Sequence, residues 1–204
     1  MPLSEPITHT VKHHPSKEAA SAQARVEAQL VEQAISGDGA AFSRLIKPHL
    51  PMLYRVAARG CGGNSDLAQD AVQETLTLVY ERLKAYTPGT SLKAFLGAIA
   101  ARRAHTLIRG ERRRRLREER GSLPEQSATP EQLASAEQLR ETIHKALYNM
   151  PKKRREAALL RLDGGMSYGE IATAMGSSEG SARVLVHLAL KELKTAIAAS
   201  QSRS

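Results

Sequence analysis

The chain has 204 residues, of which 41% are hydrophobic and 25% charged, a composition typical of a soluble globular protein with one medium-sized or two small domains. Its formal net charge of +9 favours a polyanionic partner, with nucleic acid ahead of an anionic membrane surface. A single cysteine excludes an internal disulfide, and the lack of an export signal and of ~18 consecutive apolar residues predicts a cytoplasmic protein without membrane insertion.

Residues 1–22 are expected to form a disordered tail, because the first sixteen are rich in proline and histidine and show no apolar periodicity. The histidines there lack a rigid scaffold and a fourth ligand, so we expect no metal site. From Lys17 the composition becomes rich in Ala, Glu and Gln, and apolar residues recur every three to four positions from Val26 to Ala34 before Gly37, which predicts an amphipathic helix with a glycine stop. We place the start of the first domain at residue 23.

A second helix is predicted to begin near Ala40 and to end at the glycine-rich turn of residues 60–63. Its apolar residues lie on one side, but the sequence contains Pro48 and Pro51. Proline removes a backbone donor and clashes with the preceding turn, so the helix should kink or restart there.

The third and fourth helices are separated by a Thr-Pro-Gly break. The third should be capped by Asn64 or Ser65, carry acids in its first turns and end at about Tyr86. The fourth should be capped by Thr90 or Ser91 and continue into an arginine run.

The arginine run concentrates the charge of the chain. Between Arg102 and Arg117 eight arginines face a single acid, Glu111, so seven of the nine net positive charges lie in this window. A run of this kind is either a solvated helix face or a track for a polyanion.

A linker is predicted over residues 119–132, where Ser, Pro, Thr and Gln leave almost nothing to bury. The sequence therefore predicts an all-α protein with two small helical domains joined by a flexible linker, at 23–118 and 133–200. The second domain should contain a helix over 133–147 and another over 152–162.

The second domain also contains the pattern of a helix-turn-helix. Ser167 and Glu170 form a capping box before a short helix, Gly176 supplies a left-handed stop, and Ser177 or Ser178 caps a longer helix. In such a unit the second helix enters the major groove of DNA with its first turns facing base edges. The alternative is a helical hairpin that packs without touching DNA.

Candidate DNA-binding residues follow from that geometry. Among the early positions of the second helix only Arg183 can read guanine with two hydrogen bonds, a contact worth about 1–3 kcal/mol. Basic residues at the head of the preceding helix can neutralise flanking phosphates. The predicted helix-turn-helix contacts are Lys152, Arg155, Ser178, Ser181, Arg183 and His187.

The segment from Asp66 to Leu76, DLAQDAVQETL, resembles the region-two helix of bacterial RNA polymerase sigma factors of the extracytoplasmic function (ECF) type. In that family this helix docks on the clamp coiled coil of the polymerase β′ subunit. The resemblance implies that polymerase is bound by Asp66, Asp70, Gln73, Glu74 and Leu76.

Three further segments extend the resemblance over about Leu30 to Leu193. Residues 95–100, followed by the basic run, resemble the helix that engages and melts the minus-ten promoter element. Residues 146–151 and 166–172 resemble region four, which reads the minus-thirty-five element. Regions one and three have no counterpart, as in the compact ECF class.

Strand opening requires a cationic track for the backbone and pockets for unstacked bases. The arginine run supplies the track, and Tyr86 with residues 87–91 is our candidate for the pocket, although Tyr86 is equally suited to packing on its neighbours. The residues assigned to the minus-ten region are Tyr86, Arg102, Arg103, Arg109, Arg112 and Arg113.

Several positions depart from the family pattern. Phe95 replaces the usual tryptophan, Arg102 stands where asparagine is common and Thr106 where aspartate is common. Leu185 and Leu188 occupy positions where basic residues are frequent. These departures predict altered base capture and a weakly read upstream element.

We therefore predict a sigma factor that binds core RNA polymerase through the β′ clamp and β flap, recognises promoter DNA and promotes strand opening. The alternative is a sigma-like helix-turn-helix regulator that does not itself direct initiation. An anti-sigma factor is a further candidate partner. The sequence contains no phosphate-binding glycine loop, nucleophile elbow or metal-ligand pair, so we expect no enzymatic activity, catalytic residue, cofactor or metal.

Overall fold

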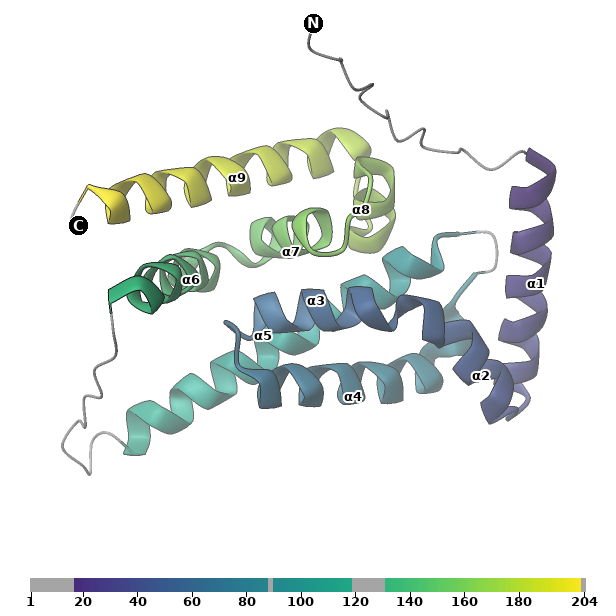
Figure 1. The fold of residues 1–204 in the computed structure, drawn as a ribbon. Helices are drawn as coiled ribbons and strands as arrows, with labels where there is room; N and C mark the ends of the chain where they lie inside the picture. Colours follow the sequence, from purple (N-terminus) through teal and green to yellow (C-terminus); the bar gives the residue numbers. More distant parts are fainter. Residues whose placement is uncertain (1–16, 88–89, 119–130, 203–204) are drawn as a thin grey trace, which may run out of the picture.

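The computed structural model describes residues 17–87, 90–118 and 131–202, and within these ranges every regular element is helical (Figure 1). The helices of the first domain are α1 (Lys17–Ile35), α2 (Gly39–Ile46), α3 (Leu50–Gly60), α4 (Ser65–Arg82) and α5 (Leu92–Glu118), with 3₁₀ turns at Lys47–His49 and Leu83–Ala85. The helices of the second domain are α6 (Glu131–Asn149), α7 (Lys152–Leu162), α8 (Tyr168–Met175) and α9 (Glu179–Gln201). The all-α fold class is confirmed.

The helix boundaries of the first domain follow the predicted caps and breaks. The proline pair restarts the second helix as expected, since a 3₁₀ turn carrying Pro48 separates α2 from α3. Asn64 caps α4, where its Oδ1 accepts a hydrogen bond of 2.9 Å from the amide of Leu67. Ser91 precedes α5 and accepts a hydrogen bond of 3.2 Å from the amide of Ala94.

The two segments expected to lack structure lie largely outside the described residues. Residues 1–16 of the tail and 119–130 of the linker belong to that part of the chain. The described ends differ from the expectation, because α1 begins at Lys17 and α6 at Glu131. Residues 17–22 and 131–132 are therefore helical, as extensions of the amphipathic patterns beside them.

The helix-turn-helix forms through the predicted capping interactions. Ser167 and Glu170 make the reciprocal capping box at the start of α8, and Gly176 ends that helix in the left-handed conformation with φ of 59°. Ser178 then caps α9, accepting a hydrogen bond of 3.2 Å from the amide of Ser181. The turn between α8 and α9 is thereby fixed by local hydrogen bonds.

The two domains pack against each other, with α7 and α8 on α5 (Figure 1). Gly97 lies at the centre of this domain contact, where an added Cβ would overlap Cε of Met166 and lie 3.1 Å from Cδ2 of Leu160. Both of these second-domain side chains are fully buried. The close approach of α5 to the second domain therefore depends on the missing side chain of Gly97.

Polar contacts surround this apolar centre. Nε of Arg59 lies 3.1 Å from Oδ1 of Asp163, and Nζ of Lys93 donates a hydrogen bond of 2.8 Å to the carbonyl of Gly165. Burial raises the pKa of Asp163, although Arg59 opposes part of that shift. No helix in the described ranges is long and apolar enough to cross a membrane.

Candidate polymerase and nucleic-acid interfaces

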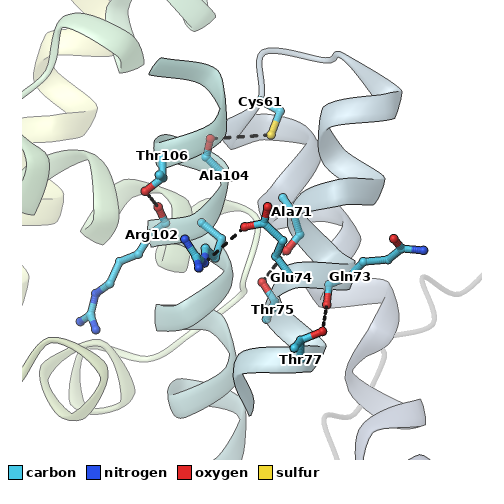
Figure 2. Close-up of polar contacts among 10 residues, drawn as sticks. Cys61, Ala71, Gln73, Glu74, Thr75, Thr77, Arg102, Ala104 and Thr106 are labelled. Carbon is cyan, nitrogen blue, oxygen red and sulfur yellow. Dashed lines mark hydrogen bonds and ion pairs between the residues drawn. The ribbon is translucent and has the colours of Figure 1, made fainter. Parts of the chain in front are cut away.

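One face of α4 is polar and open to solvent. Asp66, Asp70 and Gln73 are exposed, while Ala71 and Val72 point into the first-domain core. Figure 2 shows the side chain of Gln73 extending away from the neighbouring helices. The helical period therefore separates a buried side from a face of acids and amides that is free to contact a partner.

Glu74 and Leu76, the other two residues predicted to bind polymerase, make contacts within the first domain. Glu74 turns back toward α5, where its Oε2 lies 3.4 Å from Nε of Arg103 (Figure 2). Leu76 is half-buried and packs against the core. The exposed part of the predicted polymerase site thus consists of Asp66, Asp70 and Gln73.

The lone cysteine lies behind this face. Cys61 is buried, and its Sγ lies 3.8 Å from the carbonyl oxygen of Ala104 (Figure 2). Burial, with a smaller contribution from the charge of Asp70, raises the pKa of the thiol to about 12. The thiol therefore stays protonated at neutral pH and acts as a core residue.

The arginines of α5 divide into paired and open side chains. Arg103 pairs with Glu74, and the guanidinium of Arg112 lies 4.5 Å from the ring centre of Tyr148 in the second domain. Arg109 and Arg113 are exposed. The predicted cationic track is thus present on α5, but only part of it faces solvent.

Arg102 is committed to the domain contact. Its Nε lies 2.8 Å from Oε1 of Glu156, and its Nη2 donates a hydrogen bond of 3.2 Å to the carbonyl of Ala174. Burial raises the pKa of Glu156, and the charge of Arg102 opposes that shift. In this arrangement Arg102 binds the second domain instead of a nucleic-acid phosphate.

Tyr86 packs inside the first domain and is only 5% exposed. Its hydroxyl donates a hydrogen bond of 2.5 Å to Oε1 of Glu27, and its ring centre lies 5.5 Å from that of Phe95. Burial and the Glu27 carboxylate raise the pKa of its hydroxyl. In this structure Tyr86 packs on its neighbours, and its ring is not accessible to an unstacked base.

The basic residues at the head of α7 have different roles. Lys152 is exposed, as expected for a phosphate contact. Arg155 is only 6% exposed, and its Nη1 donates to the carbonyls of Leu147, Tyr148 and Met150. The prediction for Arg155 as a phosphate contact does not fit this structure, because its guanidinium satisfies the carbonyl oxygens at the end of α6.

The predicted reading positions at the start of α9 are all exposed, but three of the four make contacts within the domain. Arg183 lies 3.2 Å from Oε1 of Glu179 and 5.1 Å from the ring centre of Tyr168. The hydroxyls of Ser178 and Ser181 lie 2.9 Å apart. His187 has no such contact among the described residues.

Two of the exposed side chains on this part of α9 are apolar. Val184 is 57% and Leu188 38% exposed, one turn apart and beside His187. In the sequence Leu188 is notable only as a departure from the family pattern, and Val184 has no predicted role. The helical spacing of Val184, Leu188 and the buried Val186 would have revealed this outward apolar pair.

Two stretches of the chain match known families. Sigma-70 region 2 matches residues 45–114, and sigma-70 region 4 matches residues 140–193. The curated relatives include the ECF RNA polymerase sigma factor SigD of Mycobacterium tuberculosis, 33% identical over 178 residues, which are 84% of each chain. The sigma factor CarQ of Myxococcus xanthus is 33% identical over 166 residues, covering 77% of this chain and 90% of that one.

Solved structures show the same fold. CnrH, solved in complex with the cytosolic domain of CnrY, is similar with a TM-score of 0.61 and 24% identity, over 85% of this chain and 98% of that one. The sigma factor RpoE of Bartonella quintana, solved with the anti-sigma factor NepR, has a TM-score of 0.51 and 25% identity, over 76% and 97% of the two chains.

Proposed function

The chain belongs to the family of ECF RNA polymerase sigma factors, and from that premise we propose which of its surfaces bind polymerase, open the promoter and read the upstream element. The protein binds core RNA polymerase, recognises promoter DNA and promotes strand opening. The alternative, a regulator that does not direct initiation, is not favoured. We assign it no covalent chemistry and a cytoplasmic location.

Run-off transcription tests the assignment directly. Core polymerase supplemented with this protein should give promoter-specific transcripts from genomic fragments of the source organism, whereas core polymerase alone should not. Absence of any specific start site across such a library would contradict the initiation function.

The observation that carries the proposal is the exposed acidic face of α4. Asp66, Asp70 and Gln73 stand on the side of this helix that the domain leaves uncovered. Glu74 is half-buried and turned toward Arg103, so less of its carboxylate faces a partner. We assign the core polymerase contact to the three uncovered residues, within a region-two domain at 23–118, and upstream reading to a domain at 133–200.

Strand opening is assigned to the open arginines of α5. Arg109, Arg113 and Arg117 are exposed along one helix and can follow a separated strand through its phosphates. Arg102 becomes available only when it leaves Glu156, which requires the two domains to separate. An anti-sigma factor is a further candidate partner, since the similar RpoE was solved with NepR.

A double substitution of Arg113 and Arg117 by alanine should weaken holoenzyme binding to all promoters alike. Each lost phosphate contact should reduce the slope of log affinity against log salt by about one unit. Titration of promoter DNA at several salt concentrations measures that slope. The matched control replaces Arg25 and Arg44, exposed arginines of α1 and α2, and should keep the original slope. A loss confined to one promoter sequence would make the two arginines base readers instead.

The upstream element is assigned to apolar contacts as well as polar ones. Val184 and Leu188 are exposed and lie on the same stretch of α9 as Arg183, whose guanidinium is paired with Glu179. In the major groove the distinguishing apolar group is the C5-methyl of thymine. We therefore assign Val184 and Leu188 to thymine methyls in the minus-thirty-five element.

Replacing thymine by uracil in that element should weaken binding about fourfold for each methyl that loses its contact. Val184→Ser should lose the fourfold preference at the thymine that Val184 contacts, because serine has no apolar surface to match the methyl, and should keep the preference that Leu188 provides. The measurement is the affinity of the wild type and of Val184→Ser for the thymine DNA and for the uracil DNA, from which the energy that couples residue 184 to the methyl group is obtained. Ala199→Ser, at an exposed position near the end of α9, should retain the thymine preference. Full thymine preference in Val184→Ser would exclude the assignment of Val184.

A further inference from the structure

A cavity of about 590 Å³ opens where α5 faces the junction of α6 and α7. Small-molecule sites typically occupy about 300–1,000 Å³. Among the residues described, no carboxylate lines this cavity. Its walls carry basic side chains from both domains: Arg102, His105, Arg109, Arg113, Lys152 and Arg155.

The positive charge in this junction cavity is only partly compensated, by the carboxylate of Glu156, which pairs with Arg102 and also interacts with the charges of Arg155 and Lys152. Arg109 and Lys152, one from each domain, have no ion-pair partner among the described residues. Arg155 is held in place by carbonyl oxygens at the end of α6, which carry no net charge. Burial, and next the charge of Arg109, lowers the pKa of Arg155, so these two guanidinium groups are close enough to repel.

The positive charges around the junction cavity also act on His105, which lines it. Burial lowers the pKa of His105 to about 4, with further contributions from Arg155, Arg109 and Lys152. The imidazole is therefore neutral at pH 7. Its Nδ1 is buried without a hydrogen-bond partner in the described part of the chain.

The start of α7 adds to the positive potential. This 11-residue helix begins at Lys152 and has no side-chain cap. Asn149, Met150 and Lys152 bring that helix end to the cavity wall. Free amides and the helix dipole favour an anion at such an end.

We propose that the junction cavity binds a compact polyphosphate, a small anion with several phosphoryl groups, and that this anion bridges the two domains. Several charges must be neutralised within the volume of one small molecule, and phosphoryl oxygens accept from arginine and lysine together. Because Arg102, Arg109 and Arg113 also belong to the strand-opening surface, the regulatory consequence rests on the proposed function. A bound polyphosphate withholds that surface from DNA.

Calorimetric titration of the full-length protein with inorganic tripolyphosphate tests the site. At about 0.15 M salt, diffuse attraction is screened beyond about 8 Å. We expect one site, and about tenfold weaker binding for each of Arg109→Ala and Lys152→Ala. Arg117→Ala and Lys153→Ala remove the same charges from exposed neighbours on the same helices and should bind as the wild type does. Equal weakening by all four variants would show diffuse attraction and overturn the proposal.

A second variant tests the requirement for both domains. Gly97→Leu keeps every basic residue but separates the domains, so it should lose tripolyphosphate binding while circular dichroism shows unchanged helix content. Undiminished binding to this variant, in a sample whose radius of gyration shows that the domains have separated, would overturn a two-domain site. A parallel titration with a nucleoside triphosphate distinguishes the source of the phosphate: tighter binding than tripolyphosphate indicates a base contact, and equal affinity indicates phosphate recognition alone. Transcription does not enter these measurements, so their failure leaves the sigma-factor function unaffected.

Discussion

Asp70→Arg should bind core RNA polymerase at least about 30-fold more weakly than the wild type, a change of about 2 kcal/mol. Asp70 is exposed at the middle of the uncovered face of α4. A reversed charge at the centre of an interface replaces attraction by repulsion and also introduces a longer side chain. Fluorescence anisotropy of the labelled protein with core polymerase measures the affinity.

Two comparisons make this result specific to α4. Glu32→Arg makes the same charge change at an exposed position of α1 and should keep the original affinity. The Asp70→Arg protein should still bind a minus-thirty-five fragment through α9 as the wild type does. Equal loss of polymerase and upstream DNA binding would contradict the assignment of the two activities to separate domains.

The fold could be predicted closely because its boundaries are set by local chemistry. Asn64, Ser91, Ser167 and Gly176 act on backbone groups within four residues of themselves, so their capping roles are visible in the sequence. The proline restart between α2 and α3 is equally local. Helix ends shifted by a few residues where an amphipathic pattern simply continues, as at Lys17.

The candidate site was less predictable because its residues are paired over long distances in the sequence. Arg102 meets Glu156 across 54 positions, and Arg59 meets Asp163 across 104. An arginine in a basic run has the same sequence signature whether it faces solvent or a carboxylate of the other domain. Arg155 illustrates the same limit, since only the tertiary structure shows that it serves the end of α6.

The family resemblance predicted the class of the protein but not which side chains are accessible. It identified the ECF sigma factor class, which the region 2 and region 4 matches confirm. It also drew attention to Tyr86, which in this structure is held between Glu27 and Phe95 inside the domain. Motifs specify which elements are present, whereas the packing of those elements decides which side chains remain open.

Gly97→Leu should separate the two domains while leaving each helix intact. A Cβ at this position would already overlap Cε of Met166 and lie 3.1 Å from Cδ2 of Leu160, and both side chains are fully buried, so a leucine there overpacks the domain contact. Overpacking of this kind costs about 1–3 kcal/mol, enough to shift the balance between packed and separated domains by about 5- to 150-fold. Leucine favours a helix more than glycine does, so α5 itself should become more stable.

The separation should be visible in shape and in DNA binding together. Small-angle X-ray scattering should give a larger radius of gyration for Gly97→Leu, and promoter DNA should bind more tightly without polymerase because Arg102 is released from Glu156. Gly110→Leu is the matched control, since Gly110 lies on the same helix with open space around it. If the radius of gyration grows but DNA affinity does not, the domain contact is structural and does not withhold the strand-opening surface. If neither changes, Met166 has repacked and the contact tolerates the larger side chain.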